Sequence, residues 1–230
     1  MKYSNVIQGE FVSRPNRFVA RVRIGSREET VHVKNTGRCK ELLLPGARVI
    51  LSICNNPNRK TKYDLIAVYK ERESGALLIN MDSQIPNDAV FEWIKYSGIF
   101  SEKASVRREV TFGNSRFDLS VTDGGRRALI EVKGVTLEKE GIAMFPDAPT
   151  ERGIKHVCEL IRAVEEGFEA YLIFVIQMKQ VKLFRPNTEM HKEFSDALLR
   201  ARDAGVPILA MDCVVSDDCI SIDSAIPIQL

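Results

Sequence analysis

Apolar and polar residues alternate in short runs through the first eighty positions. The clearest run is 18–24, where Phe18, Ala20, Val22 and Ile24 are separated by Val19 and two arginines. The other runs lie at 31–33, 49–53, 65–69 and 76–79. Alternation with period two is typical of strands, and glycine and proline between the runs mark turns. About five short strands in this length predict a small barrel.

The pattern changes after Asn80. Residues 81–87 are predicted to be a linker or crossover, after which Asp88 can cap a helix that runs toward Gly98. We expect Val90, Ile94 and Phe91 on its inner face. A longer helix is predicted from about Thr150 to Glu166, and a last one from about Glu189 to Ala204. The inner face predicted for the longer helix consists of Ile154, Val157, Cys158, Ile161 and Val164, and Gly167 ends it.

Three strands are predicted between the first two helices. Turn signals at Gly113-Asn114 and Asp123-Gly124-Gly125 separate runs that begin at Val110, Phe117 and Ala128. The apolar run 171–176 is typical of a strand buried on both faces, and a final strand is expected at 208–211. This order of elements is that of the α/β core of the PD-(D/E)XK nuclease superfamily. The predicted fold is α+β overall, with a small OB-like barrel at 1–82 and a restriction-endonuclease-like α/β domain at 83–230.

Asp118, Glu131 and Lys133 are the candidate catalytic residues. Asp118 follows Phe117 in one predicted strand, and Glu131-Val132-Lys133 lies in the next. Residues i and i+2 of a strand share a face, so Glu131 and Lys133 point together. Two carboxylates are enough to hold Mg²⁺ or Mn²⁺ against a phosphate, and the ammonium can stabilise charge on the reacting phosphate. The carbonyl of Val132 is a further candidate ligand.

The alternative is that these are ordinary charges on a half-exposed sheet, where Glu-x-Lys is common. The strand that carries Asp118 favours the metal site. Pro146-Asp147 matches the first half of the nuclease signature, but it follows Glu131 and Lys133 in the chain, so we reject it as that element.

The charge is divided unevenly along the chain. The total is +2, but residues 1–80 hold 15 Lys and Arg against 7 Asp and Glu, whereas residues 81–230 hold 18 against 24. A basic barrel beside an acidic, metal-capable domain favours nucleic-acid binding over a basic surface that only provides solubility. Arg21 and Arg23 are candidate nucleic-acid contacts within the cluster Arg14, Arg17, Arg21, Arg23 and Arg27. The aromatic residues Phe18, Tyr63 and Tyr69 could stack on bases, although core packing is the favoured interpretation for each.

Composition and cysteine spacing argue against a membrane protein, a secreted protein and a zinc- or disulfide-stabilised protein. The chain has 230 residues, of which 44% are hydrophobic. It has no apolar run long enough to span a bilayer and no N-terminal signal pattern, so we expect a cytoplasmic protein that has no membrane partner. Five cysteines without Cys-x-x-Cys spacing indicate reduced thiols rather than disulfides or zinc ligands.

Several motifs together resemble the sugar fermentation stimulation protein A family, and the likeness runs almost end to end. The motifs are Asn35-Thr36-Gly37-Arg38, Ser115-Arg116-Phe117-Asp118, Glu131-Val132-Lys133 with Thr136-Leu137, and the block from Phe145 to His156. The resemblance implies an OB-like domain joined to a nuclease-like domain. It also implies nonspecific DNA binding and a connection to the regulation of sugar use, maltose in particular.

The resemblance also implies roles for individual residues. Glu109 would be a third metal-binding carboxylate beside Asp118 and Glu131. The implied nucleic-acid contacts are Arg38, Arg116, Arg152, Lys155 and His156, and the implied supporting residues are Asp147, Thr150 and Gln177. Arg152, Lys155 and His156 fall in the first turns of a helix, where a phosphate is favoured, although a solvated helix face explains them equally well.

Two functions remain open on the sequence alone. The chain is either a Mg²⁺-dependent endo- or exonuclease or a protein that binds DNA without cutting it. The sequence does not distinguish DNA from RNA, although the resemblance favours DNA. The apolar stretch 222–230 could pack on its own domain or pair with a second chain as a homodimer.

Overall fold

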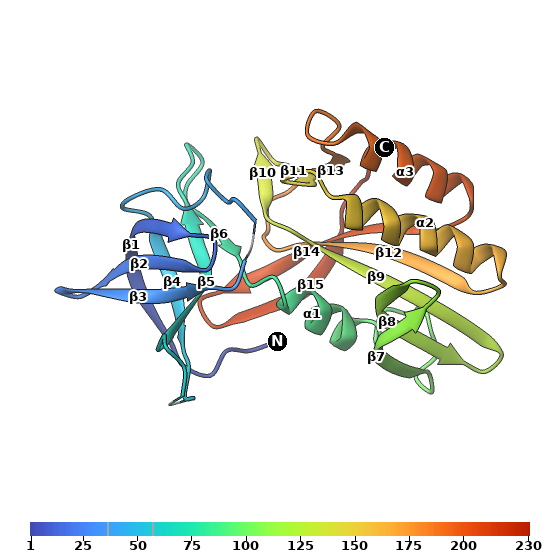
Figure 1. The fold of residues 1–230 in the computed structure, drawn as a ribbon, viewed down its shortest axis with the longest axis horizontal. Helices are drawn as coiled ribbons and strands as arrows, with labels where there is room; N and C mark the ends of the chain where they lie inside the picture. The colour runs from blue at the N-terminus through green and yellow to red at the C-terminus, as the bar shows by residue number, and fades with distance from the viewer. Residues whose placement is uncertain (36, 57) are drawn as a thin grey trace.

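A computed structural model describes residues 1–35, 37–56 and 58–230. Figure 1 shows a barrel formed by the N-terminal part of the chain beside a sheet that carries helices on both faces. Thr36, part of the motif that begins at Asn35, lies outside the described residues.

The N-terminal part forms a closed barrel of five strands, as predicted. Its strands and one extension are β1 (Val6–Asn16), β2 (Val19–Ile24), β3 (Arg27–Val33), β4 (Arg48–Ile53), β5 (Tyr63–Lys70) and β6 (Leu77–Asn80). The strand order is β3-β2-β1-β4-β5-β6, and a parallel pairing of β3 with β5 closes the barrel. The sixth strand continues the sheet beyond β5 toward the second domain.

Strand β1 was not predicted, because its apolar residues come in adjacent pairs, 6–7 and 11–12, and do not alternate with polar ones. Of its eleven residues only Phe11 is buried, so periodicity gives little signal. Its pairing with both β2 and β4 holds it in the barrel.

The second domain is built on a six-stranded mixed sheet. Its strands are β7 (Ser105–Phe112), β8 (Ser115–Asp123), β9 (Arg126–Val135), β12 (Glu169–Ile176), β14 (Ile208–Ser216) and β15 (Cys219–Ala225). The order is β15-β14-β12-β9-β8-β7, with β9, β12 and β14 parallel and the outer strands antiparallel. A small sheet of β10 (Leu137–Lys139), β11 (Ile142–Phe145) and β13 (Leu183–Pro186) adjoins it.

Helices cover both faces of this sheet (Figure 1). Helices α2 (Glu151–Glu165) and α3 (Lys192–Asp203) lie on one face, and α1 (Ile85–Trp93) lies on the other. Leu172 and Phe174 pack in the same core as Val157 and Leu160 of α2. Residues on the opposite face of the strands pack with Val90 of α1.

The predicted helices are present, with changes at their ends. Helix α1 begins at Ile85 rather than Asp88, because Pro86 fits the first turn and Asp88 becomes a first-turn acid. Helix α2 ends before Gly167, as predicted, and its N-cap is Thr150, at the predicted start of the helix. Cys158, which we expected on its inner face, is exposed.

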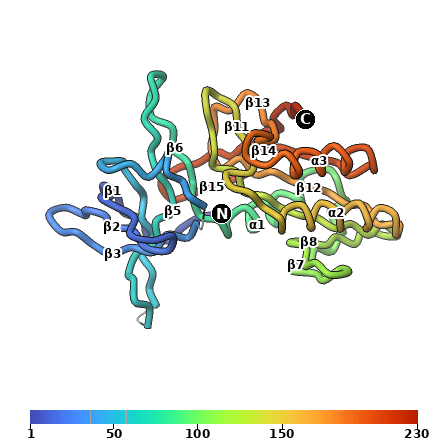
Figure 2. Tube along the Cα trace, turned by 45° about the horizontal axis from the view of Figure 1, so that its top comes forward, coloured from blue at the N-terminus to red at the C-terminus, as the bar shows by residue number. Residues whose placement is uncertain are grey.

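Polar contacts join the two domains. Gln177 donates from Nε2 to the carbonyls of Asn80 and Asp82, each at 3.1 Å. Lys70 of β5 donates to the buried carboxylate of Glu138 at 2.7 Å. The main-chain nitrogen of Tyr3 donates to the main-chain carbonyl of Asp218 at 2.8 Å, so the first residues lie against the second domain and not, as the predicted boundary implies, in the barrel. Figure 2 shows the hairpin of β5 and β6 extending beside the small sheet.

The final stretch packs on its own domain. Residues 219–225 form β15, and Ile226, Ile228 and Leu230 contact the core. None of the helices in the described part of the chain has the length and apolarity needed to cross a membrane. The five cysteines are free thiols.

Candidate metal site of the second domain

Asp118 lies between the main chain of β9 and helix α1. Its Oδ2 accepts a hydrogen bond from the nitrogen of Val132 at 2.8 Å, and its Oδ1 accepts from Nδ2 of Asn87 at 2.7 Å. Burial, followed by the negative charge of Glu131, raises the pKa of Asp118 above its ordinary value. The two carboxylates are therefore close enough to repel each other.

Glu131 is buried, and its two oxygens have different surroundings. Oε1 accepts from Nζ of Lys133 at 2.6 Å and contacts Nδ1 of His156. Oε2 is buried and has no hydrogen-bond partner among the described residues. Burial by itself raises the pKa of Glu131, but hydrogen bonds from His156 and Lys133 outweigh it and leave the pKa below its ordinary value. The carboxylate is therefore ionised at neutral pH, with one oxygen lacking a donor.

The strand geometry brings Glu131 and Lys133 together as predicted. They are separated by one residue of β9, and β12 pairs alongside in parallel. Gly134 follows directly, and a Cβ there would lie 2.6 Å from Oε1 of Gln177 and 2.8 Å from Cγ of Pro86. Only glycine leaves room for α1 and Gln177 beside the site.

The three basic residues predicted in the first turns of α2 have different contacts. His156 is buried against Glu131, and Nε of Arg152 donates to its Nε2 at 3.4 Å. Lys155 instead points to the turn after β7 and donates to the carbonyl of Asn114 at 2.6 Å. Thr150 caps the helix by accepting from the nitrogen of Gly153 at 3.0 Å. Because Arg152 donates to Nε2, the proton of a neutral His156 lies on Nδ1, toward Glu131.

Glu109 is not grouped with the other two carboxylates. It occupies an irregular position of β7 with a positive φ of 54°, and its exposed carboxylate lies 3.4 Å from Nη1 of Arg116. In the described part of the chain, no three His, Cys, Asp or Glu side chains gather in a group that could hold a metal ion. Of the three predicted carboxylates, Asp118 and Glu131 are thus the ones that lie near each other.

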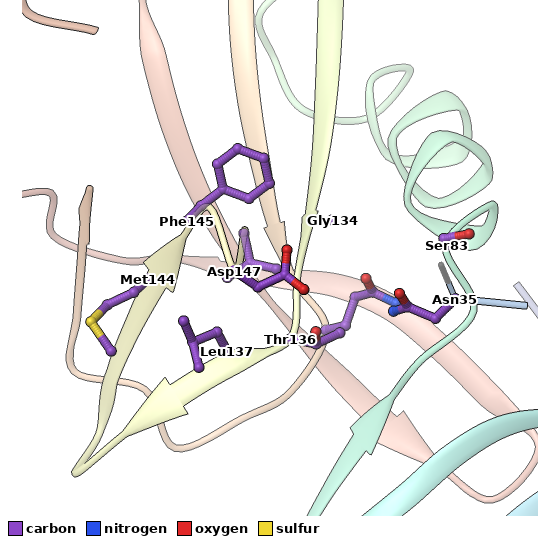
Figure 3. A pocket seen from close by; sticks show the side chains of 10 residues that line it. Asn35, Ser83, Gly134, Thr136, Leu137, Met144, Phe145 and Asp147 are labelled. Carbon is purple, nitrogen blue, oxygen red and sulfur yellow. The ribbon is translucent and has the colours of Figure 1, made fainter. Parts of the chain in front are cut away.

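Asp147 and Gln177 line a cavity beside this site. The cavity has a volume of about 100 Å³, and its walls include Asn35, Ser83 and Thr136. Figure 3 shows Asp147, Thr136, Asn35 and Ser83 around one opening between the small sheet and the linker. The cavity therefore lies at the junction of the two domains.

The basic residues predicted on the barrel have separate surroundings. Arg21 donates to Oγ1 of Thr30 at 2.8 Å, and Nη1 of Arg23 lies 2.7 Å from Glu10. Arg38 lines a cavity with Arg17 and Lys40.

Sequence reasoning missed Asn87 and the contact of His156 with Glu131. The position of Asn87, just before a predicted helix, favoured a role in the linker. Its contact with Asp118 depends on how α1 docks on the sheet. The helical spacing of His156 showed that it lay near the start of α2 but not that it faced the core.

Two family models match the chain. "SfsA N-terminal OB domain" matches residues 12–79, and "Sugar fermentation stimulation protein RE domain" matches residues 84–219. A sugar fermentation stimulation protein homolog of Desulfitobacterium hafniense (strain Y51) is 53% identical over 100% of this chain and 99% of its own length. The homolog of Clostridium beijerinckii is 52% identical over 100% of both chains.

A solved structure is similar over its whole length. It is described as the structure of Pyrococcus furiosus SfsA in complex with Ca²⁺, and it superposes with a TM-score of 0.86 at 28% identity. The alignment covers 100% of this chain and 98% of that one.

Proposed function

Because the chain belongs to the sugar fermentation stimulation protein family, we propose that it binds DNA without sequence preference and cleaves it at a divalent-cation site formed by Asp118 and Glu131, with Lys133 beside it. The barrel would attract the polyanion, and the second domain would hold the cation. Arg152 and Lys155, in the first turns of α2, would contact the DNA backbone near the site.

The observation that supports this proposal most is the free oxygen of Glu131. A buried ionised carboxylate oxygen without a donor is costly, and a bound cation would satisfy it. The negative charge of Glu131 raises the pKa of Asp118, so the two carboxylates lie near each other. One or two carboxylates are the usual protein ligands of Mg²⁺. The related protein described in complex with Ca²⁺ also favours a divalent ion, and Mg²⁺ or Mn²⁺ is the proposed cofactor.

The residues of the site would then have distinct tasks. Asp118 and Glu131 would hold the ion, which supplies charge stabilisation and lowers the pKa of a bound water. The ammonium of Lys133 would lie beside the reacting phosphate and offset its additional negative charge. His156 and Asn87 would hold the two carboxylates in place through the hydrogen bonds described above.

Cleavage assays test the proposal. The wild-type protein and the Glu131→Ala/Lys133→Ala variant are incubated with labelled single- and double-stranded DNA and RNA in Mg²⁺, Mn²⁺ or EDTA. We expect cleavage of DNA that requires the metal and that the double variant lacks. Intact polymer in every reaction would contradict the nuclease part of the proposal.

A second candidate is DNA binding without cleavage, with occupancy contributing to the regulation of sugar use. The contacts of Oε1 with Lys133 and His156 favour it, because they already compensate most of the charge of Glu131 without a cation. Under this candidate both proteins bind the polymer equally and neither cuts it. Binding weakens steeply with salt in both cases, because it releases counterions from the DNA.

A further inference from the structure

Phe18 is an exposed aromatic residue on the wall of a cavity. It lies in the turn between β1 and β2, and 44% of it is exposed. The cavity has a volume of about 460 Å³ and is lined by Phe18, His32, Lys34 and Arg59, among others. A single exposed phenylalanine is ordinary on a protein surface, but this one lies in a cavity whose wall also holds Lys34, paired with Asp82, and Arg59, paired with Asp64.

The turn fixes the main chain of Phe18. The main-chain nitrogen of Phe18 donates to Oδ1 of Asn16 at 2.9 Å, and its carbonyl accepts from the nitrogen of Val33 at 2.8 Å. The guanidinium carbon of Arg17 lies 4.7 Å from the ring centroid. A ring on an ordered main chain loses less conformational entropy on stacking than a ring on a segment that must order first.

The same cavity also contains oriented polar groups. Nη1 and Nη2 of Arg59 donate to the two oxygens of Asp64 at 2.8 and 2.6 Å. Nδ1 of His32 lies 2.9 Å from the same carboxylate. Because an ionised carboxylate only accepts, Nδ1 carries the proton. Nε2 is then the remaining hydrogen-bonding nitrogen of a side chain that is 37% exposed.

A cationic cavity lies on the other side of the same turn. It has a volume of about 430 Å³, and Arg17, Arg38 and Lys40 contribute to its walls. Arg14 also lines it, but its guanidinium is occupied by main-chain carbonyls, including those of Asn35 and Gly37 at 2.7 and 2.9 Å. Arg14 therefore fixes the loop that carries Arg38. An aromatic surface and exposed cationic side chains thus lie on the two sides of one turn.

The wall of the aromatic cavity includes residues that adjoin helix α1. Ser83 and Gln84, which precede α1, form part of its wall. Asn87 follows in the first turn of α1 and donates to Asp118. Ser83 also lines the cavity that contains Gly134, the residue after Lys133.

We propose that the cavity at Phe18 binds an unpaired base of single-stranded DNA, stacked on the Phe18 ring, with the neighbouring phosphates on Arg17, Arg38 and Lys40. This inference rests on the proposed function and names its substrate class. A base within a duplex is already stacked on its neighbours, whereas an unpaired base has a free face for an aromatic ring. The strand would enter over the barrel and pass along Ser83 to Asp118 and Glu131.

Binding measurements in EDTA test this site without competing cleavage. Fluorescence anisotropy compares labelled oligodeoxythymidylate with a blunt DNA hairpin that has a closed loop of non-nucleotide linker. We expect Phe18→Ala to raise the dissociation constant for the single strand about tenfold, the effect of one lost base stack, with the hairpin unchanged. Phe18→Trp keeps the single-strand affinity. Tyr96→Ala, which removes an aromatic ring that is 88% exposed on the second domain, is the matched control and changes neither value.

A fluorescence experiment reports on stacking directly. The chain has one tryptophan, Trp93, so Trp93→Phe combined with Phe18→Trp places a single reporter in the cavity. Saturating single-stranded DNA should quench its emission, and the hairpin should not. Absence of quenching at saturation overturns the proposal, as does equal loss of affinity for both DNAs in Phe18→Ala.

The base site at Phe18 and the cleavage site at Asp118 and Glu131 can fail independently. If Phe18→Ala binds the single strand normally while Asp118→Asn abolishes metal-dependent cleavage, the base site is wrong and the nuclease stands. If the wild-type protein binds neither DNA, both proposals are overturned.

Discussion

At the scale of single residues, the two oxygens of Glu131 are the feature on which the function depends. One contacts Lys133 and His156, and the other has no partner among the described residues. A cation at the free oxygen would compensate a buried charge, so binding should stabilise the fold. Glu109 is exposed and paired with Arg116, and it should not contribute.

Removal of one ligand should abolish this stabilisation. At a Mn²⁺ concentration about 100 times the dissociation constant, a single site stabilises the folded protein by about 2.7 kcal/mol. We expect this gain in the wild-type protein and its loss in Asp118→Asn and Glu131→Gln, measured by thermal unfolding with and without Mn²⁺.

Glu109→Gln is the matched control for this measurement, and it should keep the full gain. Loss of the gain in this variant would restore Glu109 as a ligand. A gain that persists in Asp118→Asn would place the ion elsewhere.

At the scale of elements, α2 brings His156 to the site and depends on a tightly packed first turn. Thr150 accepts from Gly153, and a Cβ on Gly153 would lie 2.8 Å from Oγ1 of Thr150 and 3.2 Å from Phe194. The Thr150 cap and the Gly167 stop were predictable, because capping depends on local sequence. The short strands β10, β11 and β13 were not, because they form by pairing between distant segments.

Loss of the cap should destabilise the protein measurably. We expect Thr150→Ala to lower the free energy of unfolding by about 1 kcal/mol, because the nitrogen of Gly153 loses its acceptor. Urea denaturation measures the change. Thr150→Ser keeps the hydroxyl and should retain most of the stability, and an equal loss in both variants would mean that the methyl group matters rather than the cap.

At the scale of the whole molecule, ion pairs tie the barrel to the second domain. Glu138 of β10 is buried and accepts from Lys70 of β5 and from the nitrogen of Gly141. Burial raises the pKa of Glu138, but the hydrogen bonds from Lys70 and Gly141 outweigh it and leave the pKa below its ordinary value. The contact therefore stabilises the folded state when the carboxylate is ionised in both states, and the stability is lost as the pH falls through the lowered pKa.

The contribution of this contact should depend on pH. We expect Glu138→Gln to lower the free energy of unfolding by about 2 kcal/mol at pH 7, the usual size for hydrogen bonds to a charged group. The difference from wild type should shrink as the pH is lowered from the unfolded-state pKa of 4.5, as measured by urea denaturation at several pH values. Glu73→Gln, at an exposed position of the same region, is the control. A difference that stays constant with pH would mean that the charge of Glu138 contributes nothing to domain docking.

The sequence by itself determined the barrel, the α/β core and the placement of Glu131 and Lys133 on one face of β9. These features follow from periodicity, turn residues and caps, which act over a few neighbouring positions. Only the tertiary structure decided the contacts of Asn87 and His156, the exclusion of Glu109 from the carboxylate pair and the exposure of Phe18. Each of these depends on how separate segments pack, as when the docking of α1 and α2 on the sheet sets the surroundings of Asp118 and Glu131. Local sequence patterns do not show which distant segments come into contact.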